Sequence, residues 1–291
     1  NQKHQGLENT AGTLMAVSDG MTYGWTSPMI PYFLSNQTHI EVTLDEAEWL
    51  ETITLLGAIA GLPFTILGVD RLGRKMSMIL SALVGFICWT IILFTTSLEL
   101  LYTARFFLGI AGDMCFVAAP MYVAEIAEPK IRGFLASVIY LQMLLGIILV
   151  YTIGALAPYY AAPSIAMALT SCQVIFFPFM PESPYYYMYK NQEANARQSL
   201  VRLRSDSSVE TEINEIRVAV ARQKLEKSRP QDIVLIRSNR FAMAIMVLLN
   251  SGQQMIGISV MLMNLHSILE EAGSVYIESS LSAIIFSVIM L

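Results

Sequence analysis

The chain has 291 residues, of which 55% are hydrophobic and only 14% are charged, and its formal net charge is −5. Its mean hydropathy is +0.54. A soluble domain of this length cannot hide so much apolar surface while it carries so few charges. The composition therefore argues against a water-soluble enzyme and for a membrane protein.

Long stretches of the sequence carry no charge at all. They are residues 76–98, 133–181, 241–269 and 279–291. A bilayer core of about 30 Å needs about 20 apolar residues in helical form. Because lipid offers no hydrogen bonds to the backbone, a spanning segment must be a helix or part of a closed barrel. Barrel strands alternate in polarity and these stretches do not, so they predict helices.

The predicted spans are taken in chain order. They cover about 11–34, 48–68, 76–96, 99–123, 134–157, 162–180, 241–264 and 279 onward. Pro158 and Pro163 mark the turn that divides the longest uncharged stretch into two spans. The last span reaches Leu291, and the first residue is Asn1 rather than Met. We therefore expect a fragment or a truncated product of a longer protein.

Lys and Arg are distributed unevenly between the connections. The 69–75 connection holds three of them, 124–133 holds two, and 181–240 holds eleven. The connections 35–47, 157–161 and 265–278 hold none. The positive-inside rule then places the N-terminus and the 181–240 segment in the cytoplasm.

A glycosylation sequon begins at Asn36, followed by Gln37 and Thr38. It falls in a connection that the charge distribution places outside the cell, where glycosylation could reach it.

The 181–240 segment differs from the rest in being polar and basic. Its apolar residues recur at helical spacing, as in Leu200 and Leu203 and then Ile213, Ile216 and Val220. The spacing predicts short amphipathic helices on the cytoplasmic side. A disordered basic linker is the alternative.

Four motifs stand at the ends of predicted spans. They are Gly68–Lys75 (GVDRLGRK), Pro120–Gly133 (PMYVAEIAEPKIRG), Pro181–Pro184 (PESP) and Gln253–Ile258 (QQMIGI). In this order and spacing they resemble the sugar porter family of the major facilitator superfamily, and the second motif looks most like the insect facilitated trehalose transporters.

The resemblance implies an all-α polytopic membrane protein of the major facilitator superfamily. Residues 1–180 would form the N-terminal six-helix transmembrane bundle, and 181–240 a cytoplasmic loop with short amphipathic helices. Residues 241–291 would supply the first one to two helices of an incomplete C-terminal bundle.

The implied function is facilitative, alternating-access uniport of a hexose or disaccharide, with trehalose among the candidates, across the plasma membrane. A non-transporting sugar sensor or degenerate paralogue is the main alternative. A proton-coupled sugar symporter and a seven-helix receptor are weaker ones, since a receptor would place its N-terminus outside. The partners would be a small sugar and the lipid bilayer, with no nucleic acid. The sequence holds no nucleophile–base set, metal cluster or phosphate loop, so we expect no enzyme activity, cofactor or metal.

Charged residues of both signs gather at the predicted cytoplasmic ends of the helices. The resemblance implies a salt-bridge network that acts as a cytoplasmic gate. Its members would be Asp70, Arg71, Arg74, Glu125, Arg132 and Glu182. Positive-inside anchoring is the alternative, but it does not explain the acidic residues.

A sugar site at mid-membrane depth needs uncharged donors and acceptors. By resemblance the substrate-binding residues would be Gln142, Gln253, Gln254, Ser259 and Thr26. Ser259 stands where the family usually has Asn, and Met263 and Asn264 replace a usual pair of tyrosines. Helix–helix packing is the alternative role of each glutamine.

Thr26 also stands where a proton-coupled relative would carry a carboxylate, which favours uniport. Asp19, two turns earlier, and Asp113 are carboxylates within spans and need partners there. Neither His39 nor His266 has metal-ligand spacing, and both are interpreted as surface residues near outer loops.

Overall fold

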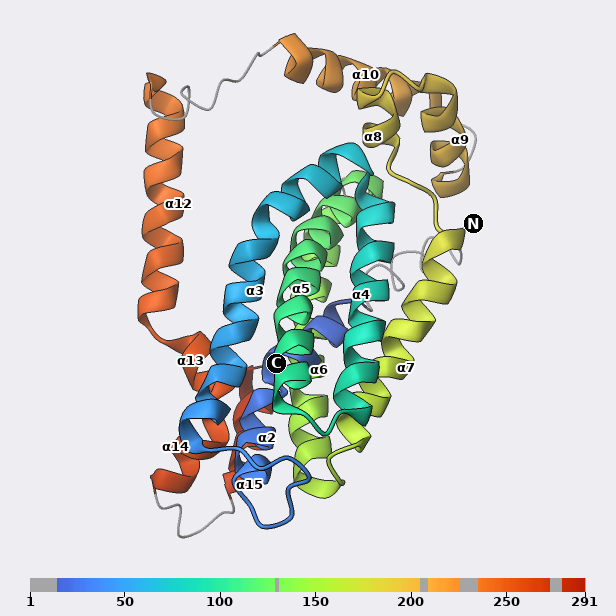
Figure 1. Ribbon diagram of the computed structural model, residues 1–291. Helices are drawn as coiled ribbons and strands as arrows, with labels where there is room; N and C mark the ends of the chain where they lie inside the picture. The colour runs from blue at the N-terminus through green and yellow to red at the C-terminus, as the bar shows by residue number, and fades with distance from the viewer. Residues whose placement is uncertain (1–14, 129–130, 205–208, 226–234, 273–278, 291) are drawn as a thin grey trace.

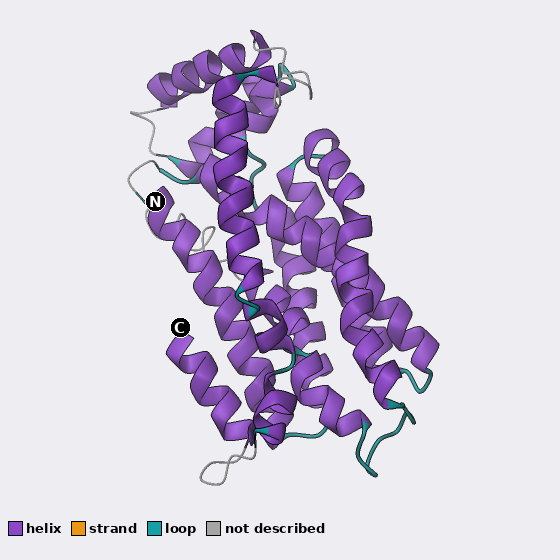
Figure 2. Cartoon of the chain, turned by 90° about the vertical axis from the view of Figure 1, so that its left-hand side faces the viewer, coloured by secondary structure: helices purple, strands orange, loops and turns teal. Residues whose placement is uncertain are grey.

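The computed structural model describes residues 15–128, 131–204, 209–225, 235–272 and 279–290. Throughout these ranges the regular structure is helical, and Figure 2 shows helices and loops without a strand. Six of the described helices are long and apolar enough to cross a membrane. The expected all-α polytopic fold is therefore confirmed.

The predicted spans match the observed helices in order. The first is a helical stretch over 15–24 that turns at Trp25 and continues as α2 (Thr26–Phe33). The next five are α3 (Leu44–Arg71), α4 (Arg74–Phe94), α5 (Leu98–Ile126), α6 (Arg132–Leu156) and α7 (Ala161–Phe176), which ends in a short 3₁₀ turn, η1 (Phe177–Phe179).

The predicted span 241–264 is wrong in one respect, because it is not a single helix. It covers most of α12 (Arg237–Met255) and all of α13 (Ile258–Met263), and α14 (Leu265–Glu271) follows it. The break falls at Gly257, whose φ of 75° lies in the left-handed region and ends α12. Only glycine adopts this conformation without strain, so the residue itself sets the end of the helix. The last described helix is α15 (Ser279–Met290).

Helices α3 to α7 stand side by side as a bundle (Figure 1). Three short helices, α8 (Pro184–Tyr189), α9 (Glu193–Leu203) and α10 (Val209–Leu225), lie at one end of it, called the loop end below. Helix α12 stands beside the bundle, and α14 and α15 pack at the opposite, far end.

Close packing of α3 on α5 depends on small residues. A Cβ added to Gly57 would overlap the backbone oxygen of Phe106, and one added to Gly109 would overlap that of Thr54. At each of these two contacts the glycine lets the backbone of the other helix approach its own. Small residues at crossings are the usual means by which membrane helices approach closely.

The outward faces of the bundle are apolar. Ile59, Phe64 and Ile66 of α3 are each more than 60% exposed, as is Phe134 of α6. None of the residues of α12 is buried. Such continuous apolar surface is unfavourable in water and is what a lipid-facing helix presents.

The helix ends follow from local chemistry. Thr43 accepts a bond from the Glu46 backbone N–H, and the Glu46 carboxylate accepts one from the Thr43 N–H at 2.8 Å, so α3 begins with a capping box. The Ser183 hydroxyl caps the N-terminus of α8 as a hydrogen-bond acceptor, and Pro184 stands in the first turn of that helix. Helices α8 to α10 then share a small apolar core of their own.

Candidate functional site

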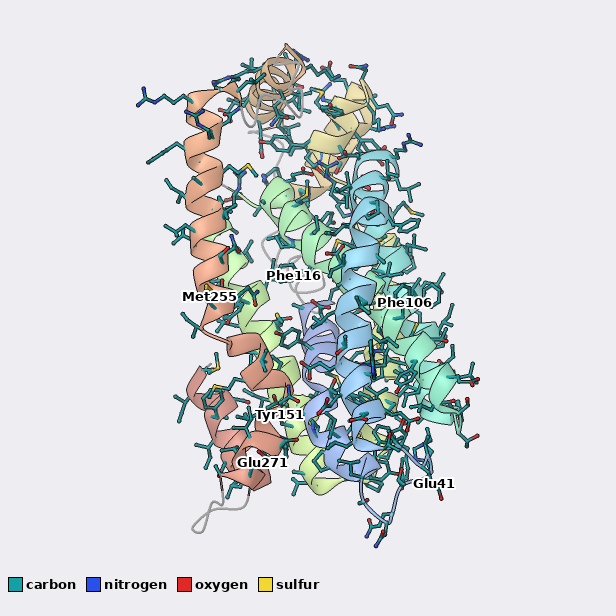
Figure 3. All side chains as sticks on the ribbon, turned by 60° about the vertical axis from the view of Figure 1, so that its left-hand side comes forward. Glu41, Phe106, Phe116, Tyr151, Met255 and Glu271 are labelled. Atoms are coloured by element: carbon teal, nitrogen blue, oxygen red, sulfur yellow. The ribbon has the colours of Figure 1, made fainter. Side chains whose placement is uncertain are left out.

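A central cavity of about 330 Å³ lies between the bundle and the segment α12–α13. Its volume is at the lower end of the range of about 300–1,000 Å³ that is usual for small-molecule sites. Polar side chains from five parts of the chain line it: Asp19, Thr22, Tyr23, Thr54, Asp113, Tyr140, Gln253 and Gln254. Its apolar wall includes Leu262 and Phe116, of which Figure 3 labels Phe116.

Two carboxylates face this cavity, from the 15–24 stretch and from α5. Asp113 accepts a hydrogen bond of 2.6 Å from the Thr65 hydroxyl on α3. Asp19 packs on Gly112, where an added Cβ would lie 2.8 Å from its Oδ1. Neither carboxylate belongs to an ion pair among the described residues. The cavity wall on the bundle side is therefore acidic.

The predicted sugar-binding residues fall into three groups. Gln253 and Gln254 line the cavity. Gln142 does not, and its Oε1 is buried without a hydrogen-bond partner among the described atoms. Tyr140, two residues earlier on α6, lines the cavity instead. The side chain of Ser259 lies outside the described part of the chain.

Thr26, the fifth predicted residue, is fully buried beside the cavity and binds Arg105. The guanidinium Nη2 donates to Thr26 Oγ1 at 2.7 Å, and Nη1 donates to the Thr22 carbonyl at 3.0 Å. The guanidinium also lies 5.1 Å from the centre of the Trp25 ring. Arg105 itself is 0% exposed. A carbonyl, a hydroxyl and a ring face thus solvate this buried cation.

Sequence reasoning did not assign a role to Arg105. A lone Arg inside an otherwise apolar span was the available signal, because such residues are buried among helices and mark functional sites.

At the loop end, Arg74 and Glu125 form the centre of the predicted charged cluster. Arg74 Nη2 and Nε donate to Glu125 Oε1 at 2.8 and 3.1 Å. The Arg74 guanidinium also lies 5.7 Å from the Tyr186 ring of α8. Both charged side chains are largely buried, so the pair ties α4 to α5 in a poorly solvated place.

Glu182 joins this cluster through backbone groups rather than through an ion pair. Its carboxylate accepts bonds from the Ser183 N–H at 2.8 Å and from the Lys75 N–H at 3.2 Å. A Cβ on Gly73 would overlap Glu182 Oε2, so the absence of a side chain there makes room for the carboxylate. Burial raises the pKa of Glu182, while the two backbone donors act in the opposite direction.

The remaining cluster residues are arranged differently. The side chains of Asp70 and Arg71 are exposed, and neither belongs to an ion pair in the described part of the chain. The Arg71 carbonyl accepts a bond of 2.7 Å from the Tyr186 hydroxyl. Arg132 is half-buried, and its Nε has no hydrogen-bond partner among described atoms. The structure thus brings Arg74, Glu125 and Glu182 together and leaves the other three outside the contacts.

The interpretation of His266 as a surface residue is wrong. It is only 6% exposed, because α14 folds back onto α2 and places the ring between Ser27 and Tyr151. His39 is exposed in the connection after α2, and burial of part of its ring lowers its pKa. Its Nδ1 lies 2.9 Å from the Tyr32 hydroxyl.

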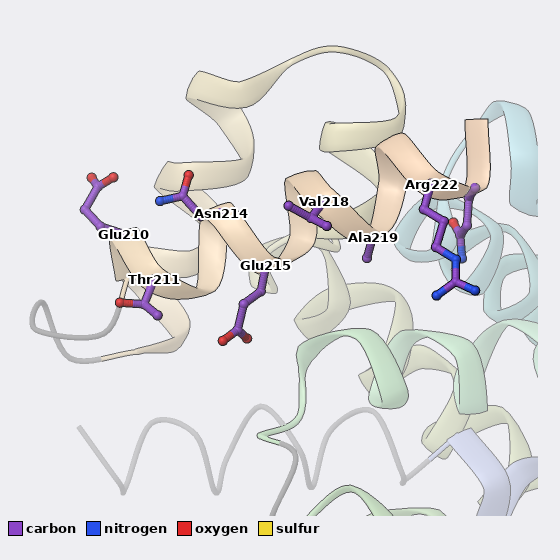
Figure 4. A pocket seen from close by; sticks show the side chains of 8 residues that line it. Glu210, Thr211, Asn214, Glu215, Val218, Ala219 and Arg222 are labelled. Carbon is purple, nitrogen blue, oxygen red and sulfur yellow. The ribbon is translucent and has the colours of Figure 1, made fainter. Parts of the chain in front are cut away.

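A second hollow lies along α10 and is open to solvent. Figure 4 shows Glu210, Asn214, Glu215 and Arg222 along the helix face that borders it. Two acidic residues and one basic residue are spread along this face without convergence on one point, as on an ordinary solvated helix face. No group of three or more potential metal ligands occurs in the described ranges.

The fold and the site together define a polytopic helical membrane protein with a central polar cavity and a charged cluster at one end. The family model for "Sugar (and other) transporter" matches residues 9–291. The chain belongs to this family.

Curated relatives include transporters of two kinds. Mouse solute carrier family 2, facilitated glucose transporter member 6, is 31% identical over 288 residues, which are 98% of this chain and 57% of that protein. The arabinose-proton symporter of Escherichia coli K12 is 29% identical, over 94% of this chain and 58% of its own. The facilitated trehalose transporter Tret1 of Drosophila virilis is 26% identical, over 93% and 30%. The chain spans about half the length of the first two.

Solved structures agree on the fold. The proton:xylose symporter XylE of the major facilitator superfamily, bound to 6-bromo-6-deoxy-D-glucose, matches with a TM-score of 0.82 at 20% identity. The match covers 99% of this chain and 67% of that one. Inward-open XylE from E. coli matches with a TM-score of 0.72. The architecture is that of a major facilitator N-terminal bundle with the helices that follow it.

Proposed function

We propose that the protein carries a neutral sugar, a hexose or a disaccharide such as trehalose, across the plasma membrane by facilitated diffusion. The central cavity supports this proposal best, since it combines the two α12 glutamines with an aromatic residue, Tyr140. Amide groups and aromatic faces are what a ring of hydroxyls requires for recognition. The names of the relatives, which include facilitated glucose and trehalose transporters, support the same substrate class.

Uniport is favoured by the side chain at position 26. Thr26 receives the Arg105 guanidinium through a neutral hydroxyl and cannot carry a proton between two states. A carboxylate there would couple its own protonation to the position of the guanidinium. In this chain the contact between Thr26 and Arg105 therefore does not change its charge.

We place the loop end in the cytoplasm and Asn36 outside the cell. The count of Lys and Arg between spans carries this orientation. Asn36 is exposed at the far end, where a glycan could be attached. In this orientation the Arg74–Glu125 pair is part of a cytoplasmic gate that holds the bundle helices together while the far end is open.

The sugar site is tested with Gln254→Ala, measured as uptake of labelled glucose and trehalose by cells without other sugar carriers. Loss of one neutral hydrogen bond of about 0.5–1.5 kcal/mol should raise the KM several-fold, up to about tenfold, at unchanged surface expression. Gln223→Ala, on the exposed face of α10, is the matched control and should leave uptake unchanged. An unaltered KM in the first variant would remove the glutamine from the site.

Proton-coupled symport is the second candidate, because Asp19 and Asp113 both line the cavity. The arabinose-proton symporter among the relatives points the same way. The two mechanisms are separated by collapsing the proton gradient with an ionophore. Uniport predicts unchanged initial uptake and an unchanged plateau at equal inner and outer sugar. Symport would be established by accumulation above that plateau that the ionophore abolishes and that is absent in Asp19→Asn.

A further inference from the structure

At the far end, the segment α13–α14 is bound to three different helices of the bundle. The Asn264 amide donates to Glu51 on α3 at 3.0 Å. The Tyr151 hydroxyl on α6 donates to the Leu262 carbonyl. Ser27 on α2 bonds twice to His266, through the backbone N–H at 3.2 Å and with ring Nδ1 at 3.1 Å. Figure 3 shows Tyr151 beside this segment.

These contacts contrast with the neighbouring helix. No residue of α12 is buried, whereas Leu265 and His266 at the start of α14 are 1% and 6% exposed. Gly257, with its positive φ, separates α12 from α13–α14. An added Cβ at Gly257 would meet nothing within 4 Å, so packing does not hold this joint. The segment α13–α14 is therefore fixed by its own hydrogen bonds and by the burial of Leu262 and Leu265 in the core, and not by α12.

His266 is the one titratable residue in the two bonds with Ser27. Ser27 Oγ accepts the His266 backbone N–H and lies within hydrogen-bonding distance of ring Nδ1. Nε2 is buried without a partner among the described atoms. The ring meets the Tyr151 ring edge to face, at 5.5 Å between centroids.

Among the side chains that the structure describes, none accepts a hydrogen bond from His266 Nε2. From α6 the titratable neighbour is Tyr151, whose hydroxyl is engaged with Leu262. From α3 it is Glu51, which is engaged with Asn264 and lies near Arg105 of α5. Tyr23 lies near Tyr151, α2 contributes Ser27, and α15 has no titratable residue.

We propose that α13–α14 is a latch over the far end of the central cavity, held closed while His266 is neutral and released by its protonation. A buried neutral histidine binds a proton more tightly once its ring reaches water, so protons favour the open latch. The signal is thus pH on the far side of the membrane. The latch rests on the proposed function in one respect only, namely that the cavity is the path of the substrate.

The test uses a cysteine in place of Leu265, in the chain with Cys88, Cys115 and Cys172 replaced by serine, reconstituted in lipid vesicles. The readout is the rate of modification by a membrane-impermeant maleimide at pH 7.5 and 5.5. Gln37→Cys, in the exposed connection at the same end, corrects for the effect of pH on thiol reactivity. No sugar is added, so the result does not depend on transport.

In the parent chain the ratio of the rate at position 265 to the rate at position 37 should rise about fivefold or more on acidification, the lower end of the usual coupling between linked equilibria. His266→Gln should abolish the rise, and Ser27→Ala should raise the ratio at both pH values. His39→Gln should respond like the parent. A ratio that stays constant in the parent, or a rise that persists in His266→Gln, would overturn the latch.

Discussion

Arg105 shows how a single residue can be buried in a membrane bundle with its charge intact. Its donors meet the Thr26 hydroxyl and the Thr22 carbonyl, and its plane faces Trp25. None of the described ion pairs includes it. Each of these three groups therefore offsets part of the free energy that is lost when a guanidinium is removed from water.

Thr26→Val should destabilise the protein by about 1.5–3 kcal/mol, the usual contribution of a hydrogen bond to a charged group. The measurement is the midpoint of thermal or denaturant unfolding in detergent. Thr170→Val is the matched control, because Thr170 is equally buried but donates only to carbonyls of its own helix. Equal losses in the two variants would contradict the role given to Arg105.

Glu182 predicts a pH dependence with a defined sign. Burial raises its pKa in the folded protein above the value of 4.5 that applies when it is unfolded. The folded state then binds more protons than the unfolded state between these two values, so its stability decreases as pH rises through that window.

Wild type should therefore gain stability relative to Glu182→Gln as pH is lowered from 8 towards 5, because the glutamine cannot titrate. The measurement is the difference in unfolding midpoint between the two proteins across this range. A difference that grows with pH in favour of wild type would show that the carboxylate is stabilised in its charged form instead.

At the scale of the elements, the α3–α5 contact decides how tightly the bundle closes. The two helices cross where Gly57 and Gly109 expose backbone to backbone. Hydropathy predicts both spans, but it does not specify which helix Gly109 meets. Only the tertiary structure shows that the neighbour is α3, beside Thr54.

Gly109→Val should cost at least about 1–3 kcal/mol, since a side chain there must separate two rigid backbones. The measurement is unfolding of the purified protein, supported by the yield of monodisperse protein in detergent. Gly133→Ala on α6 is the control: an added Cβ there meets nothing within 4 Å among the described atoms. It should be neutral or stabilise by up to about 1 kcal/mol. Similar behaviour of both variants would contradict the close crossing.

At the scale of the whole molecule, polar contacts occur at both ends of the cavity. The loop end holds the Arg74–Glu125 pair with Glu182, and the far end holds the latch. Alternating access requires that the two ends open in turn around a fixed central site. Weakening one end should therefore change the exposure of groups behind it.

Glu125→Gln should open the loop end, because the Arg74 guanidinium then loses its charged partner in a largely buried place. A cysteine introduced at Val69, which is 3% exposed, reports this as a rise of about fivefold or more in labelling rate. Glu193→Gln, which removes the exposed partner of Arg217, is the control and should have no effect. Equal rates in wild type and Glu125→Gln would argue against a gate.

Much of this arrangement was predictable because lipid imposes simple rules. Uncharged stretches in lipid must become helices, so the spans followed from hydropathy. Two of the four sequence motifs placed Arg74 and Glu125 at neighbouring helix ends. Gln253 and Gln254 were likewise expected at the cavity, and they line it. Gln142 shows the limit of such predictions, because each step of one residue along a helix rotates the side-chain direction by about 100°, and sequence alone does not fix which residue faces the cavity. Tyr140 faces the cavity in its place.

The sequence by itself determined the membrane class, the order of the spans and the one end at which Lys and Arg gather, because these depend on local composition and on the cost of polar groups in lipid. The tertiary structure alone decided which polar groups meet: Arg105 with Thr26, Thr65 with Asp113, and His266 with Ser27. These partners lie 48 to 239 residues apart in the chain. Their pairing depends on helix rotation and crossing, which no local pattern specifies.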